Sequence, residues 1–346
     1  MPFRPEPPAV SAADERTAVL WCNLGSPDEP TARAVRPYLS QFLHDHRVVE
    51  IPRAIWCLIL HGIILRTRPA KSAAKYASVW LPEGSPLKVW THKQAVMLAG
   101  WLGERGHRVT VRDAMRYAQP SIASQLDALK AEGVTRVLVL QAYPQYSATT
   151  TASVIDAVSS WSRTVRRMPE FRFVNQYHDD PLYIEALAQS VLAHWQQHGR
   201  PDQLVMSFHG IPARNIQLGD PYQAQCLETA RLLAERLQLS PDQHRVTFQS
   251  RFGRAKWLEP YTEPTLRALG AGGTGRVDVM CPGFPADCLE TLEEIAMEGR
   301  EAFLHAGGKE FHYIPALNDS PAWITALTAI AERNLAGWPT QRIAAA

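Results

Sequence analysis

Residues 204–212 read LVMSFHGIP, a short apolar run that stops at a histidine, a glycine and a proline. A second run, VDVMCPGFP, occupies residues 277–285 and leads directly into ADCLETLEE at residues 286–294. Apolar runs of this length that end at glycine and proline are typical of buried strands meeting their loops. Because ligands bind at the carboxyl ends of strands in open α/β sheets, we expect the functional site at these two loops.

Six further strand candidates alternate with helical stretches, which is typical of βαβ units and a parallel sheet. The eight candidates form two groups of four, at residues 18–24, 108–114, 136–142 and 171–176, and at residues 203–208, 245–249, 276–281 and 310–314. Similar motifs recur in the same order: MRY at residues 115–117 precedes a helix, a glycine and a strand, as does SRF at residues 250–252. We therefore expect an α/β protein of two similar Rossmann-like domains, each a four-stranded parallel sheet flanked by helices, with a cleft between them.

The expected domain organisation has one boundary, near the sequence DDP at residues 179–181. Residues 1–16 are rich in proline and alanine and are expected to form a disordered arm. The first domain then spans residues 17–178 and the second spans residues 179–346. The last helix begins after Ser320, a suitable N-cap, and we expect it to pack back on the first domain.

Composition limits the class of protein. The chain has 346 residues, of which 46% are hydrophobic and 20% are charged, and this favours a globular fold. A net charge of +2 without a basic stripe argues against a nucleic-acid partner. Five cysteines with no C-x-x-C pair argue against a disulfide framework and favour a reducing compartment, so we expect a cytoplasmic protein.

The most apolar segment is AIWCLILHGIIL at residues 54–65, flanked by Arg53, Arg66 and Arg68. It falls short of the roughly 20 apolar residues that a bilayer-spanning helix needs. Two interpretations stay open at this point. The segment is either a buried core helix or an exposed apolar lip that receives an apolar ligand or touches a membrane surface.

Acidic residues recur after the second strand-end loop at Asp287, Glu290, Glu294, Glu298 and Glu301, a spacing that places them on one face of a helix. Such a stripe is either a solvated acidic face or a track of oxygen ligands for a divalent cation. His209 adds an imidazole that can take a proton near neutral pH or bind a metal. Taken singly, a histidine at a strand end and a glutamate in the first turn of a helix both have ordinary structural roles.

Nine motifs in order carry a family resemblance. They are NLGSP (23–27), GSPL (84–87), MRY (115–117), YPQYS (143–147), SFHG (207–210), GDPY (219–222), QSRFG (249–253), DCLETLEE (287–294) and LNDSP (317–321). The chain resembles the ferrochelatase family, the lyases that insert Fe²⁺ into protoporphyrin IX with release of two protons in the last step of haem synthesis. The resemblance implies a two-domain, class II chelatase-like fold with porphyrin in the inter-domain cleft.

The resemblance also implies roles for particular residues. It implies that His209 and Glu290 are the catalytic and metal-binding pair. The acidic stripe adds Asp287, Glu294 and Glu298 as the candidate metal track. The porphyrin-binding candidates are Leu24, Arg68, Ser85, Tyr117, Tyr143 and Phe284. Because the cysteine-bearing C-terminal extension of some members is missing, we expect no [2Fe–2S] cluster and no cofactor beyond the substrate iron.

Partners follow from the same resemblance. We expect porphyrin and Fe²⁺ as substrates, a monomer, and peripheral contact with the inner face of the membrane through the apolar lip at residues 51–68. Three other functions remain open: a coproporphyrin ferrochelatase, a cobalt chelatase, and a tetrapyrrole carrier without insertase activity. A carrier would need no base beside the ring, so a metal-insertion assay separates it from the enzymes.

Overall fold

The computed structural model describes residues 3–8, 11, 15–253 and 255–341. The chain divides into two compact units. Unit 1 contains residues 1–142, 148–175 and 327–346, and unit 2 contains residues 143–147 and 176–326. This division differs from the single boundary expected near residue 178, because residues 143–147 group with unit 2 and the chain from Leu327 onward groups with unit 1.

Unit 1 is built on a parallel four-stranded sheet with the order β2-β1-β3-β4. Its strands are β1 (Arg16–Asn23), β2 (Val109–Met115), β3 (Val134–Gln141) and β4 (Glu170–Val174). Its helices are α1 (Ala32–His44), α2 (Arg53–Ile59), η2 (Leu60–Ile64), α3 (Leu65–Val79), α4 (Pro86–Glu104), α5 (Ile122–Ala131), η3 (Ala148–Ala152) and α6 (Ser153–Ser162), where η marks a π-helix. Helix α4 packs against β1 and β2, α5 packs against β1, β2 and β3, and every residue of β1 after Arg16 is buried.

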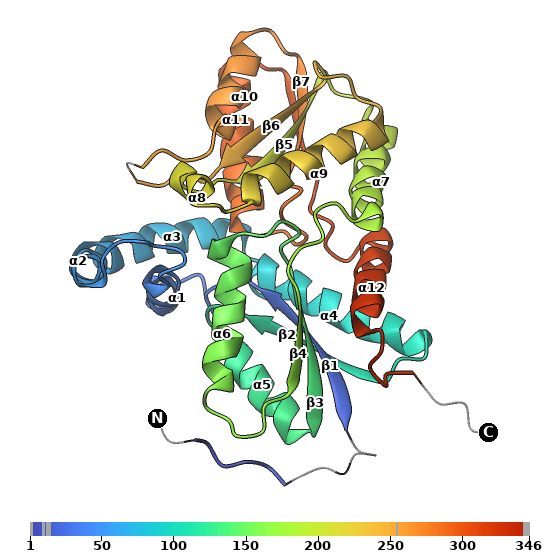
Figure 1. The fold of residues 1–346 in the computed structure, drawn as a ribbon. Coiled ribbons are helices and arrows are strands. Elements are labelled where there is room, and N and C mark those ends of the chain that lie inside the picture. The colour runs from blue at the N-terminus through green and yellow to red at the C-terminus, as the bar shows by residue number, and fades with distance from the viewer. Residues whose placement is uncertain (1–2, 9–10, 12–14, 254, 342–346) are drawn as a thin grey trace. The chain divides into compact units, whose positions relative to one another are not determined.

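Unit 2 repeats the plan, because its sheet has the order β6-β5-β7-β8 and every pair is parallel. Its strands are β5 (Gln203–His209), β6 (His244–Gln249), β7 (Arg276–Met280) and β8 (Glu310–Tyr313). Its helices are α7 (Pro181–His198), α8 (Ala213–Gln217), α9 (Tyr222–Leu237), α10 (Thr262–Ala271), η4 (Glu290–Gly299) and α11 (Arg300–His305), and α12 (Pro321–Leu335) crosses the division of the chain. In Figure 1 each sheet lies among the helices of its own unit.

The strand order places a topological switch point in each sheet. In unit 2 the chain passes from β5 to its neighbour β6 in one direction across the sheet, and from β7 to its neighbour β8 in the opposite direction. The strand order therefore reverses between β5 and β7. Ligands of doubly wound folds bind at the carboxyl ends of the two strands at such a point. The sequences quoted above for residues 204–212 and 277–285 contain these two strands and the loops that follow them.

The prediction of a disordered arm at residues 1–16 is wrong for residues 3–8 and for Arg16. Arg16 begins β1, and the amide of Arg4 donates to the carbonyl of Thr164 at 2.9 Å. The carboxylate of Glu6 accepts a hydrogen bond from the Arg166 amide at 2.7 Å and lies 2.7 Å from Lys130 Nζ. These contacts fix the arm, and they lower the pKa of Glu6 to about 2 although its burial acts in the opposite direction. Arm residues 1–2, 9–10 and 12–14 lie outside the described part of the chain.

Candidate active site

His209 ends β5 at the switch point of unit 2. Its Nδ1 lies 2.6 Å from the carbonyl oxygen of Gly210. Because a carbonyl only accepts, Nδ1 carries the hydrogen, and the lone pair of the neutral ring lies on Nε2. The ring centroids of Trp257 and Phe284 each lie 6.3 Å from that of His209. His209 therefore offers one basic nitrogen between two aromatic neighbours.

Gly210 is required by close packing behind the histidine. Its amide donates to the carbonyl of Gln249 at 2.8 Å, which holds the ends of β5 and β6 together. A Cβ at this position would meet that same carbonyl oxygen at 2.8 Å and the Trp257 ring at 3.2 Å. Any side chain would therefore push the loop away from Gln249 and move His209 with it.

Glu290 begins the helix that follows β7, and this helix differs from the sequence expectation. The spacing of the acidic residues predicts an α-helix, whereas η4 is a π-helix of ten residues. A π-helix forms i→i+5 hydrogen bonds, is rare, and frequently occurs at functional sites. Because its turn is wider, residues four apart still share a side, so Glu290, Glu294 and Glu298 remain a stripe.

Gln249 and Ser250 connect the end of β6 to this π-helix. The Gln249 amide nitrogen donates to the carbonyl of Glu290 at 2.8 Å, and its amide oxygen accepts from Ser207 Oγ at 2.8 Å. Ser250 binds the carboxylate of Glu294 through its amide at 2.6 Å and its hydroxyl at 2.5 Å. The backbone of Ser250 has φ +67°, a left-handed conformation that non-glycine residues seldom adopt. Such outliers cluster at functional sites.

Neither Gln249 nor Ser250 appears among the site residues predicted from sequence. The available signal was their position, because Gln249 ends the strand beside β5 and Ser250 begins the recurring motif at residues 250–252. Polar side chains at that position have no fixed meaning without the register of β5 and β6. That register pairs His209 with Gln249.

The carboxyl group of Glu294 has a raised pKa. Burial raises the pKa of its carboxyl group and the charge of Glu290 adds to the increase, while the Ser250 hydrogen bonds and the nearby His209 oppose it. Burial of a carboxylate next to another carboxylate is a common way to keep a proton near a reaction centre. His209, Glu290 and Glu294 are thus electrostatically linked within unit 2.

The other acidic residues of the predicted track differ in their surroundings. Asp287 is buried, and its carboxylate accepts hydrogen bonds from Tyr313 at 2.6 Å, Asn318 at 2.7 Å and Thr291 at 2.9 Å. Glu298 is exposed on η4. Asp287 therefore anchors the end of the loop after β7, just before η4, and Glu298 lies at the solvent end of the stripe.

The porphyrin-binding candidates are divided between the units, with Leu24, Arg68, Ser85 and Tyr117 in unit 1 and Tyr143 and Phe284 in unit 2. Leu24, Arg68, Tyr143 and Phe284 are half-buried. Ser85 is buried and donates to Ser26 at 2.6 Å. Tyr117 is also buried, and its hydroxyl donates to the carboxylate of Asp45 at 2.9 Å.

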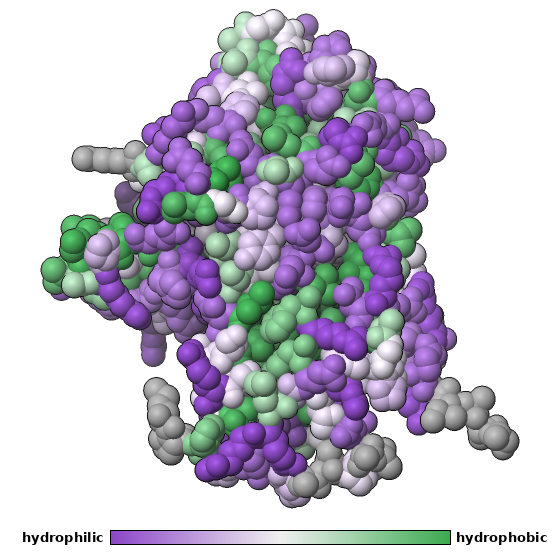
Figure 2. All heavy atoms as spheres, viewed as in Figure 1, coloured by the Kyte–Doolittle hydropathy of each residue, from purple (hydrophilic) through white to green (hydrophobic). Residues whose placement is uncertain are grey.

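The apolar segment is an exposed lip, here meaning residues 51–68. Trp56, Leu60 and Leu65 anchor it in a small core with Leu43, and Trp56 Nε1 donates to the Leu43 carbonyl at 2.6 Å. The opposite side chains are exposed, with 77% of Leu58 and 60% of Ile63 open to solvent. Figure 2 shows hydrophobic residues gathered over α2. In the described part of the chain, no helix combines the length and apolarity needed to cross a membrane.

The comparisons with known proteins settle the family, because the model named "Ferrochelatase" matches residues 16–335. The chain belongs to the ferrochelatase family. Ferrochelatases insert iron into a porphyrin. A ferrochelatase of Polaromonas sp. is 68% identical over 348 residues, covering 99% of this chain and 94% of its own. The ferrochelatases of Methylibium petroleiphilum and Bordetella pertussis are 66% and 54% identical, over 99% and 98% of this chain and 94% and 96% of their own.

The fold of this ferrochelatase family member is also found in distant chelatases. The structure of "SirB from Bacillus subtilis with Fe3+" aligns with a TM-score of 0.50 at 13% identity, over 93% of this chain and 96% of that chain. This likeness confirms the predicted class II chelatase-like fold.

Proposed function

We propose that this chain is a protoporphyrin ferrochelatase in which His209 accepts protons from the porphyrin while Glu290 meets the incoming Fe²⁺. The reaction exchanges two pyrrole N–H protons for one Fe²⁺, so it needs a base that faces the ring nitrogens. His209 is suited to this role because its Nδ1 is held by the Gly210 carbonyl, leaving Nε2 to accept a proton. This single hydrogen bond is the observation that carries the proposal.

Glu290 is proposed as the metal-binding partner because it opens η4 from the loop after β7. Its backbone carbonyl is held by Gln249, and the half-buried Glu294 lies one turn further along the same stripe. A carboxylate and an imidazole suit a borderline divalent ion, and two ligands are too few to retain it tightly. Asp287, Glu294 and Glu298 would then guide the ion as substrate rather than store it.

Porphyrin contacts are proposed for Leu24, Arg68, Ser85, Tyr117, Tyr143 and Phe284. The aromatic ring of Phe284, beside His209, supports a flat apolar ligand at this point. The guanidinium of Arg68 fits a carboxylate of the substrate periphery. The exposed side chains of the lip favour the more apolar protoporphyrin over coproporphyrin.

The same lip supports peripheral membrane contact, with the chain as a monomer at the cytoplasmic face. The proposal includes no resident cofactor and no [2Fe–2S] cluster. The rate of Zn²⁺ insertion should be measured in parallel with protoporphyrin and with coproporphyrin. Insertion into either porphyrin distinguishes an enzyme from a carrier, and the ratio of the two rates identifies the preferred substrate. Failure to metallate either porphyrin would leave only a binding role.

The central test is His209→Ala. Removal of a general base typically costs about 10²-fold or more, so metal insertion should fall by that amount. Porphyrin binding, followed by fluorescence quenching, should persist. The control is His244→Ala, at the amino end of β6. Insertion within a factor of about ten of the parent would remove His209 from the proposed role.

A further inference from the structure

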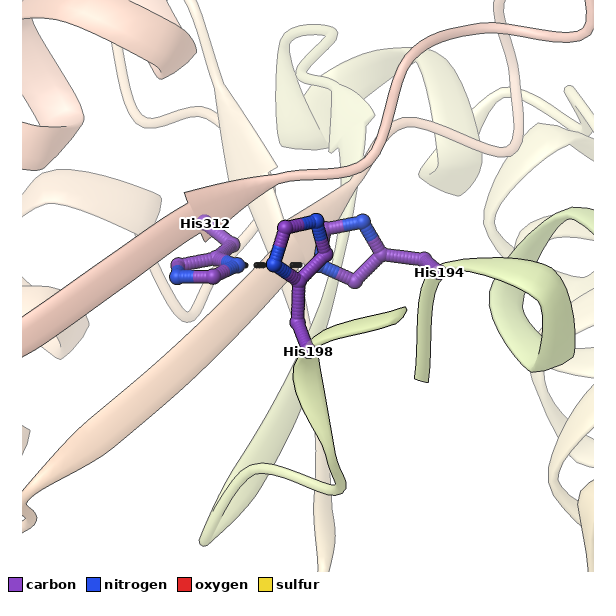
Figure 3. Close-up of side chains that lie close together, drawn as sticks. All are labelled: His194, His198 and His312. Atoms are coloured by element: carbon purple, nitrogen blue, oxygen red, sulfur yellow. Dashed lines mark hydrogen bonds between the residues drawn. The ribbon is translucent and has the colours of Figure 1, made fainter. Parts of the chain in front are cut away.

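Three histidines of unit 2 lie together in a place that the proposed reaction does not use (Figure 3). His194 and His198 lie one turn apart near the end of α7, and His312 lies in β8. One ligand atom from each of the three lies within 4.8 Å of the others. Among the described residues, no other group of three or more His, Cys, Asp or Glu side chains is brought together in this way.

The sheet register explains why these side chains meet. Asp278 in β7 pairs directly with His312 in β8, so both side chains leave the same face of the sheet. The opposite face carries Val277, Val279 and Phe311, which pack in the apolar core. α7 covers the Asp278 face, since Trp195 Nε1 donates to Asp278 at 2.9 Å and His194 Nε2 lies 3.6 Å from the same carboxylate.

The spacing suits a tetrahedral metal ion. His194 Nε2 and His312 Nδ1 are 3.1 Å apart. With Zn–N bonds of about 2.0–2.1 Å, two nitrogens of a tetrahedral site lie about 3.3 Å apart. The centroid of the His198 ring is 4.5 Å from that of His194 and 4.7 Å from that of His312, and one nitrogen of His198 lies within 4.8 Å of the ligand atoms of the other two.

A contact behind the metal-facing side of His312 orients this ligand towards the other two histidines. His312 Nε2 lies 2.7 Å from the carboxylate of Glu310, which accepts its hydrogen and leaves the lone pair on Nδ1. A carboxylate behind a histidine is the usual arrangement in zinc sites, where it fixes the tautomer and the ring orientation.

Local charge also favours a cation. The carboxylates of Asp278 and Glu310 face one guanidinium, that of Arg276, which lies 3.0 Å from Asp278 and 3.6 Å from Glu310. Asp278 is fully buried, so its charge is poorly screened by water. The carboxyl end of α7 adds the negative pole of its helix dipole.

We propose that His194, His198 and His312 form a binding site for a borderline divalent cation of the Zn²⁺ type, which joins the end of α7 to β8. Three imidazoles leave a fourth position for water or for the Asp278 carboxylate. The site is distinct from His209, because Asp278 pairs with Leu204, five residues before His209, and five residues of strand span about 16 Å.

Equilibrium dialysis of the full chain against Zn²⁺, followed by metal analysis, tests the proposal. The double variant His194→Ala/His312→Ala should bind one ion fewer per chain than the parent. The matched control is His305→Ala, an exposed histidine in the last turn of α11. It should bind as many ions as the parent. Equal stoichiometry in the double variant and the parent would overturn the site.

A second variant guards against misfolding of the first. Glu310 is half exposed, so Glu310→Ala leaves the core intact, and it should weaken Zn²⁺ binding at the cluster by about tenfold or more. Unchanged affinity in this variant would also overturn the proposal. In Glu310→Ala, the rate of porphyrin metallation at saturating metal should stay within about twofold of the parent. If the cluster delivered iron to the reaction, this rate would instead fall in proportion to the loss of bound ion.

Discussion

Asp45 lies buried in unit 1, with 3% of its side chain exposed, and three side chains bind its carboxylate. Arg116 Nη2 and Ser153 Oγ each lie 2.5 Å from Oδ2, and the Tyr117 hydroxyl lies 2.9 Å away. Burial by itself would raise the pKa of Asp45, but these hydrogen bonds, the Arg47 amide and the charge of Arg116 hold it below its ordinary value. The network therefore stabilises unit 1 only while Asp45 is ionised.

Replacing this carboxylate should cost stability in a pH-dependent way. Asp45→Asn leaves the half-buried Arg116 without its carboxylate partner, although its Nε still donates to Ser153, so we expect a loss of about 3 kcal/mol in the free energy of unfolding near pH 7, read from urea unfolding. Because the folded pKa is lower than the unfolded one, the wild-type advantage is complete above the unfolded pKa and disappears as pH falls through the folded value. The two proteins should therefore converge in acid. The control Asp28→Asn, in an exposed pair with Lys88, should cost less than about 1 kcal/mol.

Glu290 is the acidic residue whose replacement should damage insertion most. Glu290→Gln keeps the size of the side chain and removes the charge that we assign to the metal. Glu298→Gln, at the exposed end of the stripe, is the matched control, and Glu294→Gln tests the half-buried neighbour. Rates of Zn²⁺ insertion should rank Glu290→Gln below both others. Three equal losses would mean that the stripe acts only as a diffuse field.

At the scale of elements, the lip combines an anchored side with an exposed one. Leu58→Ser and Ile63→Ser remove apolar side chains that lie in solvent, each worth about 1.5–3 kcal/mol if a ligand or lipid buries it. We expect a higher KM for protoporphyrin, or weaker co-sedimentation with anionic vesicles, and little change in Tm. Leu60→Ser, at a fully buried neighbour, should instead lower Tm strongly. A large fall in Tm for the exposed variants, with KM and vesicle binding unchanged, would contradict the lip assignment.

The π-helix shows what sequence spacing does and does not determine. The acidic stripe from Glu290 to Glu298 could be predicted from the sequence, because residues four apart share a side in α- and π-helices alike. The i→i+5 hydrogen bonding of η4 could not be predicted, since it depends on tertiary contacts. Gln249 holds the first carbonyl of η4, and a Cβ at Gly299 would meet Leu266 at 3.2 Å. Neither contact can be inferred from local propensity.

For the whole molecule, all eight strands were predicted within two residues of their ends, because buried parallel strands are continuous apolar runs. The division of the chain was harder to predict. Residues 143–147 precede the expected boundary but belong to unit 2, and the chain from Leu327 follows it but belongs to unit 1. Such grouping depends on packing between segments that are distant in the sequence. The histidine cluster was missed for a similar reason, since Asp278 stands inside an apolar strand and His312 lies more than a hundred residues after His198.

The five cysteines separate into two chemical classes. Cys22, Cys226, Cys281 and Cys288 are buried, and burial raises the pKa of each of these thiols, so the reactive thiolate is scarce. Cys57 is partly open and lies in α2, within the lip. We expect a maleimide to add once to the native chain and five times after denaturation, as counted by mass spectrometry. Two or more rapid additions to the native chain would contradict this burial.

The position of that one open thiol has a practical consequence. A fluorophore attached at Cys57 would lie beside Leu58, on the surface that we expect to meet lipid or porphyrin. The native cysteine would therefore serve as the attachment point, with no engineered residue. The emission of the fluorophore would shift on transfer from water to a bilayer, and quenching of that emission would report the arrival of the tetrapyrrole in real time.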